Sequence, residues 1–212
     1  MTVRLALAVL VAGLASGPVL GLAGCAAPEA ESGLDHARLA EAWTEWVARR
    51  DSLFRTPASP LPPEARETFD GLLYFAYDST LAVPAALVPP LAPDTVAFPT
   101  TTGELRPMVA AGHLVFEADG VQWRLEAFEP LGPLPGRLFV PFRDATSGTE
   151  TYGGGRYLDL EVTDSGQYAL DFNRAYHPYC VYDVTWVCPL PPPENTIELA
   201  VTAGERFPEA EG

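Results

Sequence analysis

Apolar residues in the first third of the chain recur at helical spacing. From residue 34, large apolar side chains return every three or four positions, at Leu39, Trp43, Trp46, Val47, Leu53 and Phe54. Charged residues lie largely on the opposite side, so the pattern predicts one amphipathic helix whose Trp-rich stripe packs on the core. The alternative is that the two Trp side chains face a ligand or the membrane. Prolines between residues 57 and 63 end the helix, and no second long helix is predicted.

The rest of the chain alternates short apolar runs with turn residues, which predicts strands. We predict about nine, at residues 69–77, 95–101, 105–110, 113–118, 121–128, 137–142, 156–162, 168–173 and 196–201. Short strands at this density predict a mainly β fold, an antiparallel β-barrel or sandwich with one N-terminal helix. Asp119-Gly120 lies between two alternating runs, as a type I′ hairpin requires.

Two of these strands, residues 156–162 and 168–173, place apolar and polar side chains on opposite faces. If they form a hairpin with their apolar rows on one face, Gly166 takes the left-handed position of a three-residue loop. In this register Asp159 lies opposite Asp171, with their Cβ atoms about 5 Å apart, and Tyr157 lies opposite Asn173. Such a carboxylate pair could be a solvated sheet face, part of an Arg-bridged structural network, or the acid/base or metal-holding pair of a functional pocket.

The N-terminus has the pattern of a lipoprotein signal peptide. Arg4 precedes an uncharged, mostly apolar stretch at residues 5–21, and Leu22-Ala23-Gly24-Cys25 then forms a lipobox. We expect cleavage before Cys25, lipid on its thiol, a spacer through residue 33 and a single domain over residues 34–212. The alternative is an uncleaved membrane anchor. On the first interpretation the domain lies in the cell envelope outside the cytoplasm, tethered to a membrane by its lipid.

The charge of the chain restricts its partners. A formal net charge of −15 argues against binding nucleic acid or anionic lipid head groups. The sequence also contains no GxSxG, HExxH or Walker motif, so the common hydrolase, metalloprotease and nucleotidase signatures are missing. We expect no resident metal or cofactor.

Two cysteines remain after lipidation of Cys25. In an exported protein, Cys180 and Cys188 predict one disulfide. The alternatives are two unpaired thiols, or a metal site that uses both thiols and His177.

Polar and aromatic residues concentrate between residues 141 and 195, which is where a site is expected. The residues that we expect to bind a ligand are Arg143, Asp144, Tyr152, Arg156, Tyr157, Asn173, Arg174 and Tyr176. Asp159 and Asp171 are the candidate catalytic residues. Residues 153–155, three glycines before Arg156, are interpreted as a flexible turn, because a strand rather than a helix is predicted to follow them.

The same segment resembles the bacterial family known as domain of unknown function 1684. The resemblance rests on residues 141–148 (PFRDATSG), 150–153 (ETYG), 155–160 (GRYLDL), 171–176 (DFNRAY), 188–191 (CPLP) and 194–195 (EN). It implies a shared fold but no activity, because none is established for the family. His177 departs from the family pattern, which usually has Asn there, and this weakens any mechanism that uses the imidazole.

These observations leave three functions open. The first is a binding module that captures a small polar or anionic ligand with Arg143, Arg156 and Arg174. The second is a hydrolase-like or metal-assisted enzyme that uses Asp159 and Asp171. The third is a structural or partner-binding envelope lipoprotein. Binding is favoured over catalysis because no activated nucleophile or complete metal-ligand set can be assembled from these residues.

Overall fold

The computed structural model describes residues 33–92, 94–131 and 136–207. The predicted signal peptide, Cys25 and most of the spacer lie outside these residues. Within the described part of the chain, no helix is both long and apolar enough to cross a membrane.

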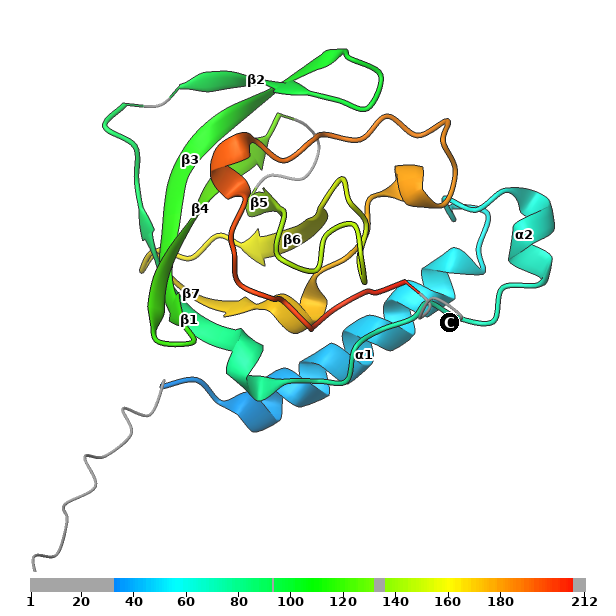
Figure 1. The fold of residues 1–212 in the computed structure, drawn as a ribbon, viewed down its shortest axis with the longest axis horizontal. Helices are drawn as coiled ribbons and strands as arrows, with labels where there is room; N and C mark the ends of the chain where they lie inside the picture. The colour runs from blue at the N-terminus through cyan, green and yellow to red at the C-terminus, as the bar shows by residue number, and fades with distance from the viewer. Residues whose placement is uncertain (1–32, 93, 132–135, 208–212) are drawn as a thin grey trace, which may run out of the picture. The chain divides into compact units, whose positions relative to one another are not determined.

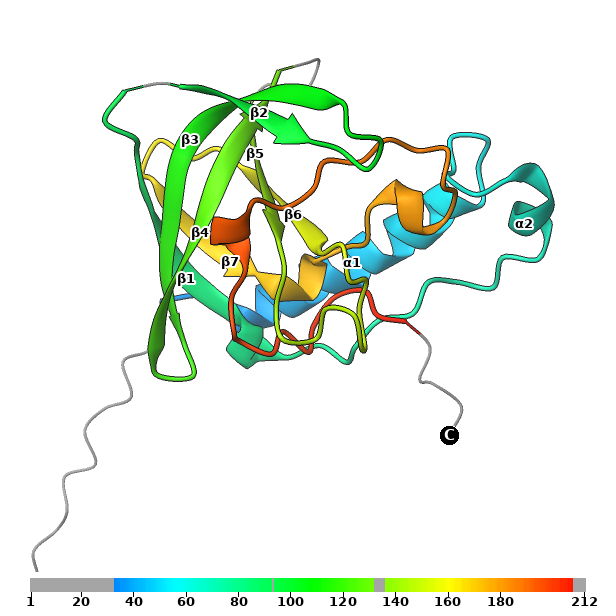
Figure 2. The same ribbon diagram turned by 45° about the horizontal axis from the view of Figure 1, so that its top comes forward.

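The fold is a seven-stranded antiparallel sheet that curls into a nearly closed barrel (Figures 1 and 2). Its strands are β1 (Ala82–Val88), β2 (Thr95–Pro99), β3 (Leu105–Ala118), β4 (Val121–Pro130), β5 (Arg137–Phe142), β6 (Arg156–Glu161) and β7 (Gln167–Asp171). The spatial order is β6-β5-β4-β3-β1-β7, and β2 pairs with β3 beside this path. The prediction of a mainly β fold is confirmed. Of the two predicted architectures, barrel and sandwich, the structure has the nearly closed barrel.

A bend in β3 lets one strand serve two parts of the barrel. Two of the predicted strands join to form β3, which pairs with β2 through its first half and with β1 through its second half. Between the halves the β3–β4 register shifts at Gly112, whose φ is +127°. A Cβ there would lie 2.2 Å from the carbonyl oxygen of Val88, so only glycine permits this close approach of β1.

Apolar side chains form two clusters, one on each face of the curled sheet. The larger cluster fills the barrel and includes Leu114, Leu125, Val140, Phe142, Leu158, Leu170 and Phe172. A smaller one lies on the outer face of β2 to β6 and consists of Phe98, Met108, Phe128, Phe139 and Tyr157. The two clusters follow from the alternation of side chains along each strand.

The N-terminal helix α1 (His36–Phe54) lies beside the barrel on an irregular layer rather than on the sheet itself. Asp35 caps it by accepting a hydrogen bond from the Arg38 N–H. Trp43 packs on Tyr77 with ring centroids 5.5 Å apart, and Trp46 packs on Tyr74 at 6.0 Å. The predicted helix is confirmed; of its apolar stripe Phe54 is fully buried, whereas both Trp side chains stay half-buried.

Short helices connect the remaining segments. They are α2 (Pro63–Glu67), η1 (Ser79–Leu81), η2 (Phe172–Arg174), η3 (Tyr179–Val181) and η4 (Pro193–Asn195). The Asp119-Gly120 hairpin is confirmed, with φ of 52° and 69° at its two turn residues.

Two predicted strands are wrong, and one strand was missed. Residues 69–77 form only an isolated bridge from Tyr74 to Glu205, and residues 196–201 only a bridge from Thr196 to Arg143. In the second segment Ile197, Leu199 and Val201 are buried alternately, as in a strand, but hydrogen bonds from side chains replace much of the strand pairing. The missed strand is β1, whose run of small residues is interrupted by Pro84.

Candidate functional site

The barrel stays open between β6 and β7, a gap that we call the seam. β6 pairs on its other side with β5, and β7 with β1. One end of the seam is closed by the two backbone hydrogen bonds between Tyr157 and Tyr176, of 2.9 and 3.0 Å. The other end is closed by the loop after β6, in which the Thr163 hydroxyl donates to the Gln167 carbonyl over 3.0 Å.

This arrangement contradicts the predicted hairpin. Side-chain alternation along both strands and the left-handed Gly166, with φ of 65°, are as expected. The strands nevertheless lie at the two ends of the sheet path rather than against each other. Asp159 and Asp171 are therefore not a cross-strand pair, and the enzyme hypothesis loses the geometry on which it depended.

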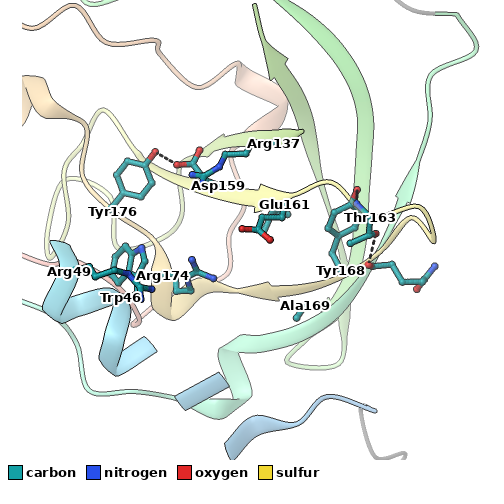
Figure 3. Close-up of a pocket in the computed structure, with 12 residues that line it drawn as sticks. Trp46, Arg49, Arg137, Asp159, Glu161, Thr163, Tyr168, Ala169, Arg174 and Tyr176 are labelled. Carbon is teal, nitrogen blue, oxygen red and sulfur yellow. Dashed lines mark hydrogen bonds between the residues drawn. The ribbon is translucent and has the colours of Figure 1, made fainter. Parts of the chain in front are cut away.

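A pocket of about 530 Å³ occupies the seam (Figure 3). We call it the seam pocket; it is lined by Trp46, Arg49, Arg137, Asp159, Leu160, Glu161, Thr163, Gln167, Tyr168, Ala169, Arg174 and Tyr176. Arg137 lies beside Asp159 in Figure 3, whereas Arg174 and the α1 residues come from the opposite wall. Trp46 and Arg49 of α1 thus complete the lining of the pocket.

Asp159 and Tyr176 form the polar end of this pocket. The Tyr176 hydroxyl donates to Asp159 Oδ2 over 2.8 Å. Desolvation by the surrounding protein raises the pKa of Asp159, whereas the hydrogen bond from Tyr176 and the nearby Arg137 oppose this rise. The Arg50 guanidinium lies 4.6 Å from the centre of the Tyr176 ring, a cation–π contact that holds the ring in place.

A second pocket adjoins the first and shares Trp46, Arg137, Asp159 and Tyr176 with it. This outer pocket, of about 700 Å³, lies over the apolar cluster on the outside of the sheet. Its other lining residues are Arg50, Arg106, Met108, Pro130, Leu131, Phe139, Tyr157, Pro178, Tyr179, Trp186, Val187, Cys188 and Pro189. Both volumes lie within the range of small-molecule sites, which is roughly 300 to 1,000 Å³.

Arginines outnumber carboxylates around the two pockets, although the chain as a whole is acidic. Five arginines line them, against Asp159 and Glu161. Arg49 pairs with Glu45, and Arg50 with Glu205. The other three, Arg106, Arg137 and Arg174, have no carboxylate within 4.0 Å among the described residues.

Most residues predicted to bind a ligand instead stabilise the fold. Arg156 is fully buried and donates to the carbonyls of Val201, Ala203 and Glu205, and it pairs with Asp144 over 3.4 Å. Burial lowers the pKa of Arg156, and Asp144 opposes this effect. The prediction that this pair lies in a ligand site is wrong, because both side chains are closed off from solvent.

Asn173 and Asp171 form a second buried polar cluster. The Asn173 side chain accepts from the Asp78 N–H at Oδ1 and donates from Nδ2 to the Asp78 carbonyl, both over 2.8 Å. The backbone N–H and Nδ2 of Asn173 also donate to Asp171 Oδ1. Asp171 is 5% exposed and lies outside both pockets. These residues tie the start of η1 to the end of β7.

The remaining predicted residues divide between scaffold and site. Arg143 donates to the Pro191 carbonyl over 3.1 Å, and the Tyr152 N–H donates to His177 Nε2 over 3.3 Å; neither residue lines a pocket. Tyr157 lines the outer pocket, but its hydroxyl is bonded to the Pro189 carbonyl. Only Arg174 and Tyr176, with the candidate catalytic Asp159, reach the seam pocket.

Sequence reasoning missed Arg137 and the residues of α1 as parts of the site. Arg137 begins a strand that was predicted, but the direction of its side chain depends on how the sheet curls. The only signal for the α1 residues was the Trp-rich stripe, and of its two Trp side chains Trp46 lines the seam pocket. Glu205, 1% exposed, was also missed, although it anchors Arg50 beneath Tyr176.

The cysteines are adjacent but not joined. Cys180 and Cys188 are both free thiols, and the Cys180 N–H lies 3.2 Å from Cys188 Sγ. The predicted disulfide is therefore not formed in this structure. Across the described ranges, no three His, Cys, Asp or Glu side chains gather where they could hold a metal ion, which removes the alternative with His177.

The fold and site thus define a small, nearly closed β-barrel with an Arg-lined pocket at its seam. The chain belongs to the family described as "Protein of unknown function (DUF1684)", whose model matches residues 67–206. It is also similar to the solution structure of an uncharacterised protein from Haloarcula marismortui. That structure is 39% identical, with a TM-score of 0.67, and the match covers 82% of this chain and 96% of that one. No curated protein matches.

Proposed function

We propose that this protein is an envelope lipoprotein whose barrel binds a small anionic ligand in the seam pocket. The observation that supports binding is the set of guanidinium groups with no carboxylate partner among the described residues, Arg137 and Arg174 in the seam pocket and Arg106, which donates to the Val187 carbonyl, in the outer one. A guanidinium binds carboxylate or phosphate through two parallel hydrogen bonds. Membrane attachment through Cys25 is supported by the lipobox alone.

Two guanidinium groups are placed to bind an anion in the seam pocket despite the net charge of −15. In the seam pocket the two carboxylates, Asp159 and Glu161, lie with Arg137 and Arg174, while the third arginine, Arg49, is paired with Glu45. The Tyr176 hydroxyl already occupies one oxygen of Asp159. The guanidinium groups of Arg137 and Arg174 are therefore available to contact a ligand, and Trp46 and Tyr168 provide apolar walls.

The test is thermal unfolding of the chain from residue 26 on, with and without carboxylates, phosphates and sugars. The described residues all lie in one compact unit, which this part of the chain contains. A ligand at a hundred times its Kd adds about 2.7 kcal/mol to the free energy of unfolding. Arg137→Ala and Arg174→Ala should lose the stabilisation by anions.

The matched control is Arg38→Ala, which removes an exposed arginine of α1 that lines neither pocket. It should keep the full stabilisation. If an anion stabilises both pocket variants as strongly as the parent protein, the seam pocket is not the binding site.

A further inference from the structure

The outer pocket indicates what kind of anion the protein accepts. We propose that the ligand is a single-chain amphiphilic carboxylate, with its head group at Arg137 and Arg174 in the seam pocket and its apolar chain in the outer pocket. This inference rests on the proposed function and adds the class of ligand.

The first argument is continuity between a charged and an apolar compartment. Arg137, Asp159, Trp46 and Tyr176 line both pockets, so a molecule anchored at Arg137 has the outer pocket directly beside it. There the walls are Met108, Phe139 and Tyr157, the apolar cluster on the outside of the sheet. A chain laid along this wall would remove apolar surface from water on both partners.

The second argument is the exposure of large apolar side chains at the rim of the outer pocket. Leu131 is 59% exposed and Trp186 is 41% exposed, and both line this pocket. Exposed apolar residues that gather at a concave site indicate a ligand-binding surface. The head-group end has no comparable cluster, so the apolar part of the ligand belongs in the outer pocket.

The third argument concerns the charge of the head group. Asp159 and Glu161 lie in the same pocket as the arginines, and they repel every anion. A dianion such as a phosphate monoester doubles both this repulsion and the attraction to Arg137 and Arg174, so its second charge brings no net gain where two carboxylates balance two guanidinium groups. The pocket therefore gives a dianion no advantage, and a carboxylate matches the two parallel hydrogen bonds of a guanidinium.

The experiment compares acetate, octanoate and 1-octanol by titration calorimetry against the chain from residue 26 on, below the micellar concentration of octanoate. Burial of methylene groups contributes roughly a fourfold gain in affinity for each one. With partial burial of six added methylenes, octanoate should bind about a hundredfold or more tighter than acetate. Octanol, which has the chain but no charge, should bind far more weakly than octanoate, and Arg137→Ala should remove this difference.

Leu131→Asn tests the outer pocket without disturbing the core, and Leu105→Asn is its control. Leu105 is 66% exposed and lines neither pocket. Leu131→Asn should weaken octanoate binding about fivefold and leave acetate binding unchanged, whereas Leu105→Asn should change neither.

Each contrary outcome has a distinct meaning. If octanoate binds no tighter than acetate, or octanol binds as tightly as octanoate, the proposal of an amphiphilic carboxylate is wrong. Neither result contradicts anion binding in the seam pocket. If no anion binds and none stabilises the fold, the proposed function itself is wrong.

Discussion

The buried carboxylate of Glu205 is predicted to be essential for stability. Its Oε1 accepts a hydrogen bond from Arg50 Nε, and its Oε2 accepts from the His177 N–H at 2.7 Å and the Tyr182 hydroxyl at 2.8 Å. The side chains of the ion pair are 10% exposed for Arg50 and 1% for Glu205. Burial opposes the charge of Arg50, but Glu205 outweighs this effect and raises the pKa of Arg50.

Glu205→Gln keeps the size of the side chain and removes its charge. The new amide nitrogen must face either Arg50 or the two donors at Oε2, so at least one buried donor loses its acceptor. Breaking a buried ion pair by removing one partner costs about 3–5 kcal/mol. For a domain of this size that corresponds to a fall in Tm of roughly 10 °C.

The assay is urea unfolding, comparing the midpoint and slope of Glu205→Gln with those of the parent protein. Glu129→Gln is the matched control, because Glu129 is exposed on β4, and it should change stability by less than about 0.5 kcal/mol. A loss below about 1 kcal/mol in Glu205→Gln would refute the reasoning that this ion pair holds α1 against the barrel.

Three further predictions concern single side chains. Burial lowers the pKa of His177 to about 3. Between about pH 6.5 and 3 the unfolded chain therefore binds a proton that the folded chain does not. Lowering the pH should destabilise the parent protein by up to about 1.4 kcal/mol per pH unit more than it destabilises His177→Asn. Equal pH slopes in urea unfolding would contradict this. Gly112→Ala should lose at least about 2 kcal/mol of stability, because its Cβ meets Val88, and an unfolding midpoint equal to that of the parent would disprove the close approach. Tyr176→Phe removes the hydrogen bond to Asp159, so the pKa of the Asp159 carboxyl should rise further, and an unchanged value in an NMR titration would count against that bond.

The sequence predicted which face each residue of β6 and β7 occupies, but not which strand lies beside them. Alternation assigns Leu158 and Leu170 to the barrel interior and Asp159 to the outside, as found. It says nothing about neighbours, and the short loop suggested a hairpin. The strand that pairs with β7 is β1, which was not predicted because Pro84 interrupts its sequence. Pro84 lies just before the pairing of β1 with β3 begins at Ala85.

The polar residues between residues 141 and 195 were predicted to bind a ligand, but most of them stabilise the fold. Arg156 and Asn173 are polar residues that a sequence cannot distinguish from binding residues, since the same donors satisfy either a ligand or the backbone. In the fold they bind carbonyl and N–H groups of segments that lack regular pairing, such as Val201 and Asp78. Buried irregular backbone requires such partners.

The site itself depends on contacts between distant parts of the chain. Trp46 and Arg174 come together in the wall of the seam pocket opposite Arg137 (Figure 3), although they are far apart in the sequence. Their meeting follows from the position of α1 on the layer formed by residues 69–78, where Trp46 packs on Tyr74. No local pattern contains this information.

The most direct test of the central claim is a ¹H–¹⁵N NMR titration of the chain from residue 26 on with sodium acetate, taken to saturation. Binding in the seam pocket predicts that shift changes concentrate at the amides of Asp159, Glu161, Ala169 and Arg174 and at the indole of Trp46. Sodium chloride at equal ionic strength should leave these signals in place. No change at these positions, or changes centred instead on Arg143, would contradict the account.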